Sequence, residues 1–185
     1  MTKLPIKCGV RYKGYEDELQ GAKIEAAFLL KEINACGPKE TMRLHQELLP
    51  KLFRKLGKNT WFEVPMNVDY GQATEIGDDC YFNHHLSIGD GALVKIGNGV
   101  IVGPYVGFYT ASHPLDPKER AEGWQTAAPI EIGNNVWIGA NVTILGGVKI
   151  GANSVIGAGS VVTKNIPAHT LAYGVPAKPV RKLNK

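Results

Sequence analysis

The chain has 185 residues, 44% of them hydrophobic and 21% charged, which is enough apolar sequence to bury the core of one domain. Its formal net charge of +4 is too small to indicate a nucleic-acid-binding protein. The charge is unevenly distributed, because no acidic residue follows Glu131 and the remaining segment is purely basic. Its cations are Lys149, Lys164, Lys178, Arg181, Lys182 and Lys185. A basic end on a slightly acidic body favours a local anionic ligand.

The cysteine pattern and the N-terminus indicate a reducing compartment and no membrane attachment. Cys8, Cys36 and Cys80 are far apart and form no CxxC pair, which argues against a disulfide framework and against a zinc ribbon. Residues 1–14 are basic but lack the apolar stretch of a signal peptide. The apolar cluster at residues 26–30 is too short to cross a bilayer. We therefore expect a cytoplasmic protein.

Residues 1–57 are expected to form a helical N-terminal segment. A first apolar stripe at helical spacing consists of Ala22, Ala26, Leu29, Leu30 and Ile33. Gly37 and Pro38 end this helix. A second stripe runs from Leu48 to Leu56 and contains Pro50. Either the second helix kinks at this proline, or its regular part starts near it.

A six-residue repeat dominates the chain from residue 76 onward. Its apolar lead residues are Ile76, Phe82, Ile88, Ile96, Val102, Phe108, Ile132, Ile138, Ile144, Ile150, Ile156 and Val162. This period suits one short strand and one turn per repeat, with each lead side chain in a stacked core. Glycine follows most lead residues and permits a tight corner. The pattern predicts an all-β body over residues 58–167, a parallel β-helix with triangular coils of about 18 residues.

The repeat is interrupted at residues 109–128, which predicts a loop that projects from the β-helix. His113 lies in this loop and is our candidate general base, since histidine titrates near neutrality. The alternative is a surface histidine without a role. Beyond the repeat, Pro167, Pro176 and Pro179 predict an extended basic tail at residues 168–185, which forms one structural unit with the rest.

Other candidate residues depart from the repeat or carry unusual side chains. Asn83 stands where most repeats have glycine, so it either orients a ligand or oxyanion or belongs to an asparagine ladder. His84 and His85 are alternative metal ligands, but adjacent strand residues point to opposite faces, which favours surface or structural roles. Trp137 is either a wall beside an acyl-donor channel or a contact between coils.

Several runs of residues resemble the maltose and galactoside O-acetyltransferases. They are Asp69-Tyr70-Gly71, Ile76-Gly77, Tyr81-Phe82-Asn83, residues 109–115, Asn135-Val136-Trp137-Ile138-Gly139, residues 156–164 and Gly174-Val175-Pro176-Ala177. The resemblance covers nearly the whole chain and is most specific from about residue 58 onward. It implies a left-handed β-helix and a homotrimer with active sites between neighbouring subunits. It also implies transfer of acetyl from acetyl-CoA to a sugar hydroxyl, with no metal required.

The same resemblance implies roles for individual residues. His113 matches the general base, Asn83 and Asp69 fall where acceptor-site polar residues lie, and Tyr81 belongs to the same acceptor-side run. Positions that match the CoA groove are Trp137, Ala140, Ala158, Thr163, Lys164, Lys178 and Arg181. Small alanines suit a shallow groove for pantetheine, and the basic tail independently suits the CoA phosphates.

Departures from the family pattern lie on the acceptor side. Gly91 stands where the galactoside enzymes have an acidic contact, and Asp90 precedes it. Gly14 replaces an N-terminal aspartate, with Asp17 nearby, while Asp69 follows the maltose-type pattern. We therefore expect Asp90 and Asp17 to contribute to acceptor binding, and the identity of the sugar stays open between maltose, glucose and galactoside types. No cysteine matches a catalytic position, so we expect direct attack rather than an acetyl-cysteine intermediate.

Two other classes of protein remain as alternatives. A zinc hydratase resembling the γ-class carbonic anhydrases uses the same β-helix, and His84, His85 and His113 are its candidate ligands. The zinc hydratase hypothesis does not explain the basic tail. The second alternative is a non-catalytic scaffold, because a β-helix by itself does not specify a function.

Overall fold

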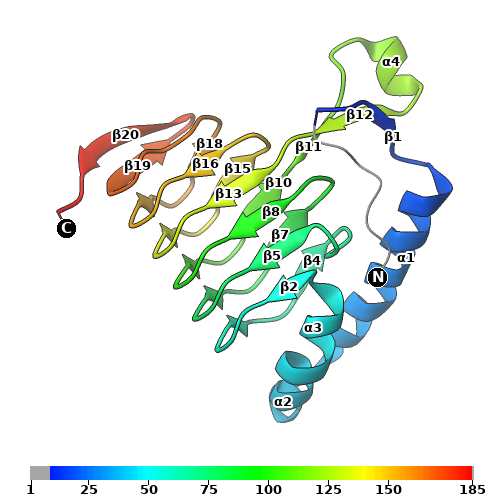
Figure 1. Ribbon diagram of the computed structural model, residues 1–185, viewed down its shortest axis with the longest axis horizontal. Helices are drawn as coiled ribbons and strands as arrows, with labels where there is room; N and C mark the ends of the chain where they lie inside the picture. The colour runs from blue at the N-terminus through cyan, green and yellow to red at the C-terminus, as the bar shows by residue number, and fades with distance from the viewer. Residues whose placement is uncertain (1–8, 185) are drawn as a thin grey trace.

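The computed structural model describes residues 9–184, so Cys8 and Lys185 of the predictions above lie outside the described residues. The N-terminal region contains a short strand followed by a helical stretch that lies at one end of the β-helix, next to β2 and β4 (Figure 1). Its elements are β1 (Tyr12–Lys13), α1 (Asp17–Ala35), the 3-10 helix η1 (Pro38–Glu40), α2 (Thr41–Arg43), the π-helical turn η2 (Leu44–Leu48) and α3 (Leu49–Leu52). No helix within residues 9–184 has the length and apolar character needed to span a membrane.

The helices follow the predicted stripes, with one correction. In α1 the apolar stripe is confirmed, because Ala26, Leu30 and Ile33 are buried and the helix ends before Gly37. Pro50 lies in the first turn of α3, directly after the wide π-helical turn η2. Since proline has no backbone N–H, the start of a helical segment accommodates it best. The second helix ends at Leu52, and Leu56 belongs to a strand instead, so the prediction for the end of this stripe was wrong.

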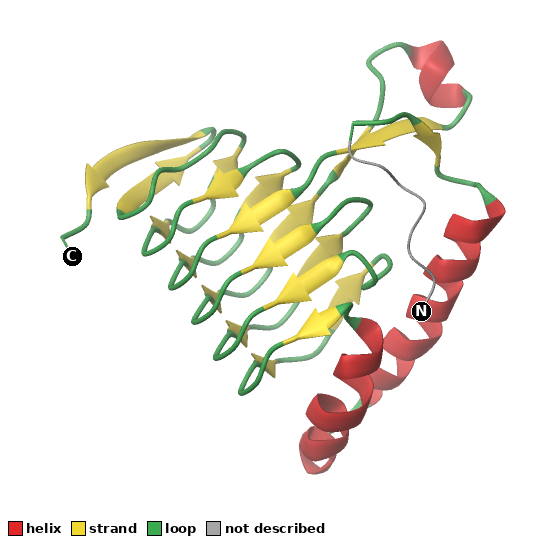
Figure 2. Ribbon diagram, viewed as in Figure 1, coloured by secondary structure: helices red, strands yellow, loops and turns green. Residues whose placement is uncertain are grey.

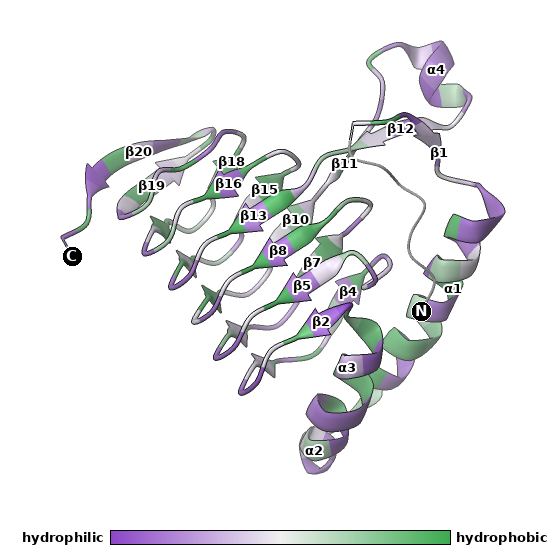
Figure 3. Cartoon of the chain, in the orientation of Figure 1, coloured by the Kyte–Doolittle hydropathy of each residue, from purple (hydrophilic) through white to green (hydrophobic). Residues whose placement is uncertain are grey.

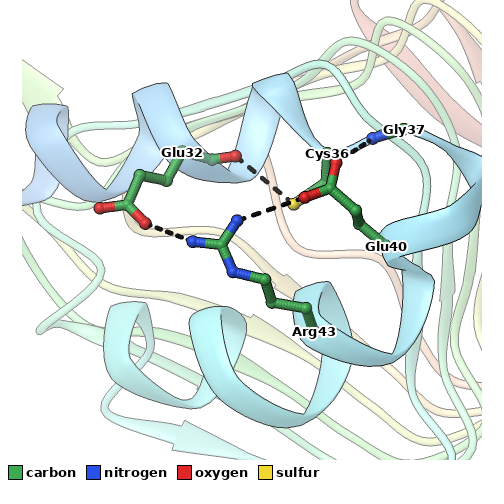
Figure 4. A network of polar contacts seen from close by, with 5 residues as sticks. All are labelled: Glu32, Cys36, Gly37, Glu40 and Arg43. Atoms are coloured by element: carbon green, nitrogen blue, oxygen red, sulfur yellow. Dashed lines mark hydrogen bonds and ion pairs between the residues drawn. The ribbon is translucent and has the colours of Figure 1, made fainter.

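A polar network joins the end of α1 to α2 (Figure 4). The Arg43 guanidinium lies 2.7 Å from the Glu32 carboxylate and 3.4 Å from that of Glu40. Gly37 donates its backbone N–H to Glu40 at 3.0 Å, and the Cys36 thiol donates to the Glu32 carbonyl at 3.4 Å. These contacts are mostly exposed, so each adds little to stability, but together they fix the turn between the two helices.

The β-helix has about six turns, here called coils, and three parallel faces (Figure 2). The charged face consists of β2 (Lys55–Leu56), β5 (Thr74–Ile76), β8 (Val94–Ile96), β13 (Ile130–Ile132) and β16 (Lys149–Ile150). The aromatic face consists of β3 (Trp61–Phe62), β6 (Tyr81–Phe82), β9 (Ile101–Val102), β14 (Trp137–Ile138), β17 (Val155–Ile156), β19 (Thr170–Gly174) and β20 (Ala177–Lys182). The polar face consists of β4 (Met66–Val68), β7 (Leu86–Gly89), β10 (Gly107–Tyr109), β15 (Thr143–Leu145) and β18 (Val161–Val162).

The predicted core is confirmed, since every lead residue of the six-residue repeat is at most 3% exposed. Each fully buried valine, isoleucine or phenylalanine side chain stabilises the fold by roughly 1.5–3 kcal/mol relative to an exposed one. The coil formed by β2, β3 and β4 precedes the first lead residue recognised in the sequence. Leu56, Phe62 and Val68 occupy its lead positions, so the β-helix begins at Lys55, slightly before the predicted residue 58.

The outward residues give each face its character. The outward row of the charged face alternates in sign through Lys55, Glu75, Lys95, Glu131 and Lys149. The outward row of the aromatic face is Trp61, Tyr81, Ile101, Trp137, Val155 and Leu171. The outward row of the polar face is Asn67, Ser87, Gly107, Thr143 and Val161. Figure 3 shows the resulting alternation of hydrophilic and hydrophobic positions along the strands.

The predicted projecting loop contains its own secondary structure. It consists of β11 (Ala111–Ser112), the short helix α4 (Pro117–Ala121) and β12 (Trp124–Ala127). β12 pairs antiparallel with both β11 and β1, which forms a small sheet beside the β-helix (Figure 1). The segment predicted as an extended tail also differs from expectation. β19 continues the aromatic face into a last coil, and β20 folds back antiparallel against β19.

The corners between faces differ in the space that they leave for a side chain. A Cβ atom at Gly133, between the charged and aromatic faces, would lie 2.5 Å from the backbone nitrogen of Ala152 in the next coil. At Gly89, between the polar and charged faces, the nearest atom is a side-chain carbon of Tyr109 at 3.5 Å, an ordinary contact. This explains why glycine dominates the first corner, while the second holds Asp69, Tyr109, Leu145 and Thr163 at the equivalent positions.

We predict that Gly133→Ala lowers the free energy of unfolding by about 1–3 kcal/mol, because the added methyl group forces two coils apart. Gly89→Ala is the matched control, with an expected change below about 1 kcal/mol. Urea unfolding of both variants at one protein concentration measures the difference. Equal losses for the two variants would show that the spacing between coils is not what selects glycine.

Candidate active site

The candidate residues lie on two edges of the polar face. Asn83, Ala140 and Ala158 occupy the edge between the aromatic and polar faces, here called the donor edge. The opposite edge, between the polar and charged faces, is here called the loop edge. It carries Asp69, Asp90, the projecting loop with His113, Thr163 and Lys164. Within one chain, Asn83 and His113 are separated by a polar-face strand such as β7, which is about 13 Å long.

The donor edge forms a row of residues along the β-helix axis. Asn83 lies in the second coil, and Ala140 and Ala158 lie in the fourth and fifth coils. With about 4.8 Å between coils, the row from Asn83 to Ala158 spans about 14 Å. Trp137 lies beside this row, on the outside of β14, and is 55% exposed. Its indole therefore does not fill the core between coils. Tyr81 lies half-buried in the same outward row of the aromatic face.

Two of the candidate basic residues lie on β20, at the C-terminal end of the β-helix, and of these Lys178 lies nearer the donor edge. In the antiparallel pair of β19 and β20, Lys178 lies opposite Tyr173 and Arg181 opposite Leu171. Tyr173 stacks over the corner of the preceding coil, because a Cβ atom at Gly157 would lie 2.8 Å from its Cβ atom. Lys178 thus lies above the coil that carries Ala158. Thr163 and Lys164 are exposed after β18, at the loop edge of the last coils.

Asn83 is held with its amide group partly free. Its side-chain oxygen accepts the backbone N–H of His84 at 2.7 Å, so its NH₂ group is the part that remains to donate to a ligand. His84 donates from Nδ1 to the Val64 carbonyl at 2.9 Å, since a carbonyl only accepts. The His85 ring stacks on Tyr105, with 4.5 Å between ring centroids. No three histidine, cysteine, aspartate or glutamate side chains cluster as a metal site among residues 9–184.

His113 lies exposed directly after β11, in the projecting loop. The two residues that follow it are held by Arg120, whose guanidinium donates to the carbonyls of Pro114 and Leu115 at 2.9 and 2.8 Å. The exposed side chain of His113 leaves its ring accessible to a ligand.

A polar cluster at the loop edge contains residues that sequence reasoning missed. The Lys23 ammonium lies 3.1 Å from the Asp69 carboxylate, and Tyr12 donates to the Gln125 side-chain oxygen at 3.3 Å. Burial, followed by the Asp69 carboxylate, raises the pKa of Tyr12, and the same causes with smaller ones raise the pKa of Tyr70 to about 12. Both phenols therefore stay protonated near neutral pH and do not serve as bases. No spacing signal in the sequence links these distant segments.

Asp90 has a structural position that the sequence did not reveal. Its carboxylate is fully buried and accepts the backbone N–H groups of Tyr70 and Ala73 and the hydroxyl of Thr74, at 2.9, 3.2 and 2.9 Å. Burial raises the pKa of Asp90, and these hydrogen bonds oppose the shift. The expectation that Asp90 contacts an acceptor is therefore corrected, because its oxygens hold the corner of the preceding coil. Asp17 lies exposed at the first turn of α1.

Comparisons with known proteins identify similar chains. Residues 129–164 match the family model of the bacterial transferase hexapeptide with six repeats. The chain is 38% identical to the galactoside O-acetyltransferase of Escherichia coli strain K12 over 179 residues, which cover 97% of this chain and 88% of that protein. The structure of a maltose O-acetyltransferase from Clostridium difficile 630 matches with a TM-score of 0.93 and 34% identity, over 100% of this chain and 99% of that one.

A third match includes a bound ligand. The structure of a hexapeptide-repeat acetyltransferase from Vibrio cholerae O1 biovar eltor, complexed with acetyl coenzyme A, has a TM-score of 0.91 and 36% identity over 100% of both chains. Together these matches confirm the predicted left-handed β-helix of hexapeptide repeats with a helical N-terminal region.

We predict that Asp90→Ala lowers the free energy of unfolding by about 3 kcal/mol, because it leaves three buried donors without an acceptor. The corresponding fall in Tm is about 6–12 °C for a chain of this size. Asp69→Ala is the matched control, since Asp69 only pairs with an exposed lysine and its loss costs less than about 1 kcal/mol. Thermal unfolding at fixed protein concentration distinguishes them, and a stable Asp90→Ala variant would return Asp90 to the acceptor site.

Proposed function

Because the chain belongs to the hexapeptide-repeat acetyltransferase family, we propose that it transfers the acetyl group of acetyl-CoA to a sugar hydroxyl, with His113 as general base. The sugar is of the maltose, glucose or galactoside type. Enzymes of this family are acetyl-CoA-dependent O-acetyltransferases, and acetyl-CoA is their co-substrate. This membership sets aside the zinc hydratase and the non-catalytic scaffold. The observation that carries the proposal is the donor edge, an open row that runs from Asn83 toward a basic end.

The donor edge matches the shape and charge of acetyl-CoA. Pantetheine is long and narrow, and the small side chains of the half-buried Ala140 and the exposed Ala158 allow it to approach the backbone. Trp137 supplies an apolar wall beside the row. Lys178 and Arg181 meet the phosphates at the C-terminal end, where charge-assisted hydrogen bonds are strong. This orientation puts the thioester near Asn83, and Thr163 and Lys164 come from the loop edge of a neighbouring chain.

The acceptor lies between Asn83 of one chain and the polar cluster of its neighbour. Asp69 and Lys23 offer an acceptor and a donor to sugar hydroxyl groups, while Tyr12 offers a neutral phenol. Tyr81 and Asp17 border the same space on the two chains. Paired donors and acceptors of this kind suit a polyhydroxylated ligand better than an apolar one.

The reaction is a direct transfer. A ring nitrogen of His113 takes the proton of the sugar hydroxyl while its oxygen attacks the thioester carbon. The Asn83 NH₂ group donates to the oxyanion that develops on the former carbonyl oxygen. The carbon–sulfur bond then breaks, and the departing CoA thiolate recovers the proton from His113. Alignment of the two substrates supplies much of the remaining acceleration.

A homotrimer brings the two halves of the site together. His113 and Asn83 lie on different edges of one chain, so a neighbouring chain must supply one of them. The aromatic face exposes large apolar side chains, with Trp61 at 43% and Ile101 at 50%, and exposed apolar patches often mark contacts between proteins. The outward side chains of the charged face alternate in the sign of their charge, and such a face is best exposed to solvent. The two buried cysteines of the described chain, Cys36 and Cys80, are free thiols, which supports a cytoplasmic location.

We predict that His113→Ala lowers kcat by about 10²–10⁴-fold at saturating acetyl-CoA and sugar, the usual contribution of a positioned base. The acetyl-CoA KM and the trimer are expected to survive, because the buried lead residues are unchanged. Release of CoA over a panel of sugars measures the rate, and sedimentation measures the assembly. A trimeric variant within a few-fold of the parent rate would exclude His113 as the base.

Mixing two inactive variants tests the shared site. Trimers assembled from equal amounts of His113→Ala and Asn83→Ala chains contain sites with one intact His113 and one intact Asn83. About a quarter of all sites recover both residues if neighbouring chains share each site. No recovery after unfolding and joint refolding would show that each chain builds its site alone.

We predict that Lys178→Ala/Arg181→Ala raises the acetyl-CoA KM by at least about tenfold and weakens its dependence on salt, because two contacts to phosphate are lost. The sugar KM is expected to change much less. Lys95→Ala/Lys149→Ala removes the same charge from the charged face and serves as the control. An unchanged donor KM in the tail variant would show that β20 only increases solubility.

A further inference from the structure

The backbone around His113 is held by contacts outside the β-helix. β11 ends at Ser112, which pairs with Thr126 of β12, so the residue before His113 is fixed to this hairpin. The residues after His113 are fixed to α4 through Arg120. The small sheet of β1, β12 and β11 is hydrogen-bonded separately from the three faces. The position of His113 therefore depends on whatever holds β12 and α4.

Residues 9–15, here called the N-terminal strap, lie along the outer edge of β12. Tyr12 pairs with Gln125 and Lys13 with Trp124 in the β1–β12 ladder. The Gly9 backbone N–H donates to the Ala127 carbonyl at 3.1 Å, and the Tyr15 hydroxyl donates to the Glu122 carbonyl at 3.0 Å. The strap thus contacts the loop from its base to the end of α4.

Trp124 is the centre of these contacts. The Arg11 guanidinium and the Lys13 ammonium each lie 4.9 Å from the centroid of its ring. The indole N–H donates to the Glu122 carboxylate at 3.1 Å, and Arg11 also lies 3.0 Å from the Glu119 carboxylate in α4. Two cations of the strap therefore bind one aromatic ring of β12, and one of them also binds α4.

We propose that the N-terminal strap positions His113 for catalysis, and that Trp124 is the positioning residue through which the strap acts. The proposal rests on the role of His113 as base given above. Trp124 is half-buried and outside the main hydrophobic core, so its contacts matter for the placement of the loop more than for the stability of the β-helix. Small displacements of a catalytic group are costly, since a shift of about 1 Å reduces a rate by as much as about 10²-fold.

The test compares Trp124→Ala with Trp124→Phe in the full-length protein. For Trp124→Ala we expect kcat to fall by about 10–100-fold, with the acetyl-CoA KM and the thermal midpoint unchanged. Trp124→Phe keeps an aromatic face for the two cations and is expected to recover most of kcat. Arg11→Met/Lys13→Met is expected to reproduce the loss, while Lys95→Met/Lys149→Met on the charged face is the matched control.

Limited digestion with trypsin gives a readout that does not depend on catalysis. Lys118 and Arg120 lie in α4, and cleavage after them is expected to be at least several-fold faster in Trp124→Ala than in the parent or in Trp124→Phe. Parent-like kcat and digestion in Trp124→Ala would overturn the proposal, and so would a loss of kcat accompanied by a lower thermal midpoint. If His113→Ala retains full activity, the proposed base is wrong, while faster digestion of Trp124→Ala would still show that the strap holds the loop.

Discussion

Stacking of the coils on a common six-residue spacing is the constraint on which this molecule depends. Each lead side chain is buried above an equivalent one, and the parallel ladders keep neighbouring coils in register. Positions at equal distance from a lead residue therefore form straight rows along the axis. Ala140 and Ala158 each lie two residues after a lead residue and form such a row, and Asn83, one residue after Phe82, lies on the same edge. The site is thus a consequence of the repeat together with a few departures from it.

Much of this architecture could be predicted from the sequence, because the six-residue spacing of the lead residues is typical of a β-helix. The lead residues of the first coil were not recognised because Glu63 and Asp69 replace glycine after Phe62 and Val68. β20 was not recognised because its proline suggested only an extended chain. Within the site, the places of Asn83 and Ala158 on the donor edge can be found by counting residues along the repeat. Contacts between distant segments cannot be found in this way, so no sequence signal indicated that Lys23 and Trp124 lie near the site. Asp90 was misread because its burial depends on donors from a corner about twenty residues earlier.

The three faces of the β-helix differ in the chemistry of their outward side chains. The aromatic face has large apolar side chains, the polar face has small ones, and the charged face pairs its own ions. Close approach of a second chain is favourable where side chains are small or apolar and costly where charges must be stripped of water. The two edges that carry the candidate residues border the polar face. In the proposed homotrimer, a neighbouring chain packed against the polar face would therefore bring the candidate residues of two chains near each other.

The alternating row of the charged face also restricts how this chain can change in length. The ladder places Lys55, Glu75, Lys95, Glu131 and Lys149 in one row, in which neighbouring residues carry charges of opposite sign. Like charges directly opposite in a sheet destabilise it. Duplication of a single coil, or deletion of a single internal coil, would bring two lysines or two glutamates together, whereas a change by two coils would preserve the alternation. The alternating surface charge of this face therefore favours an increase in the length of the β-helix by an even number of coils.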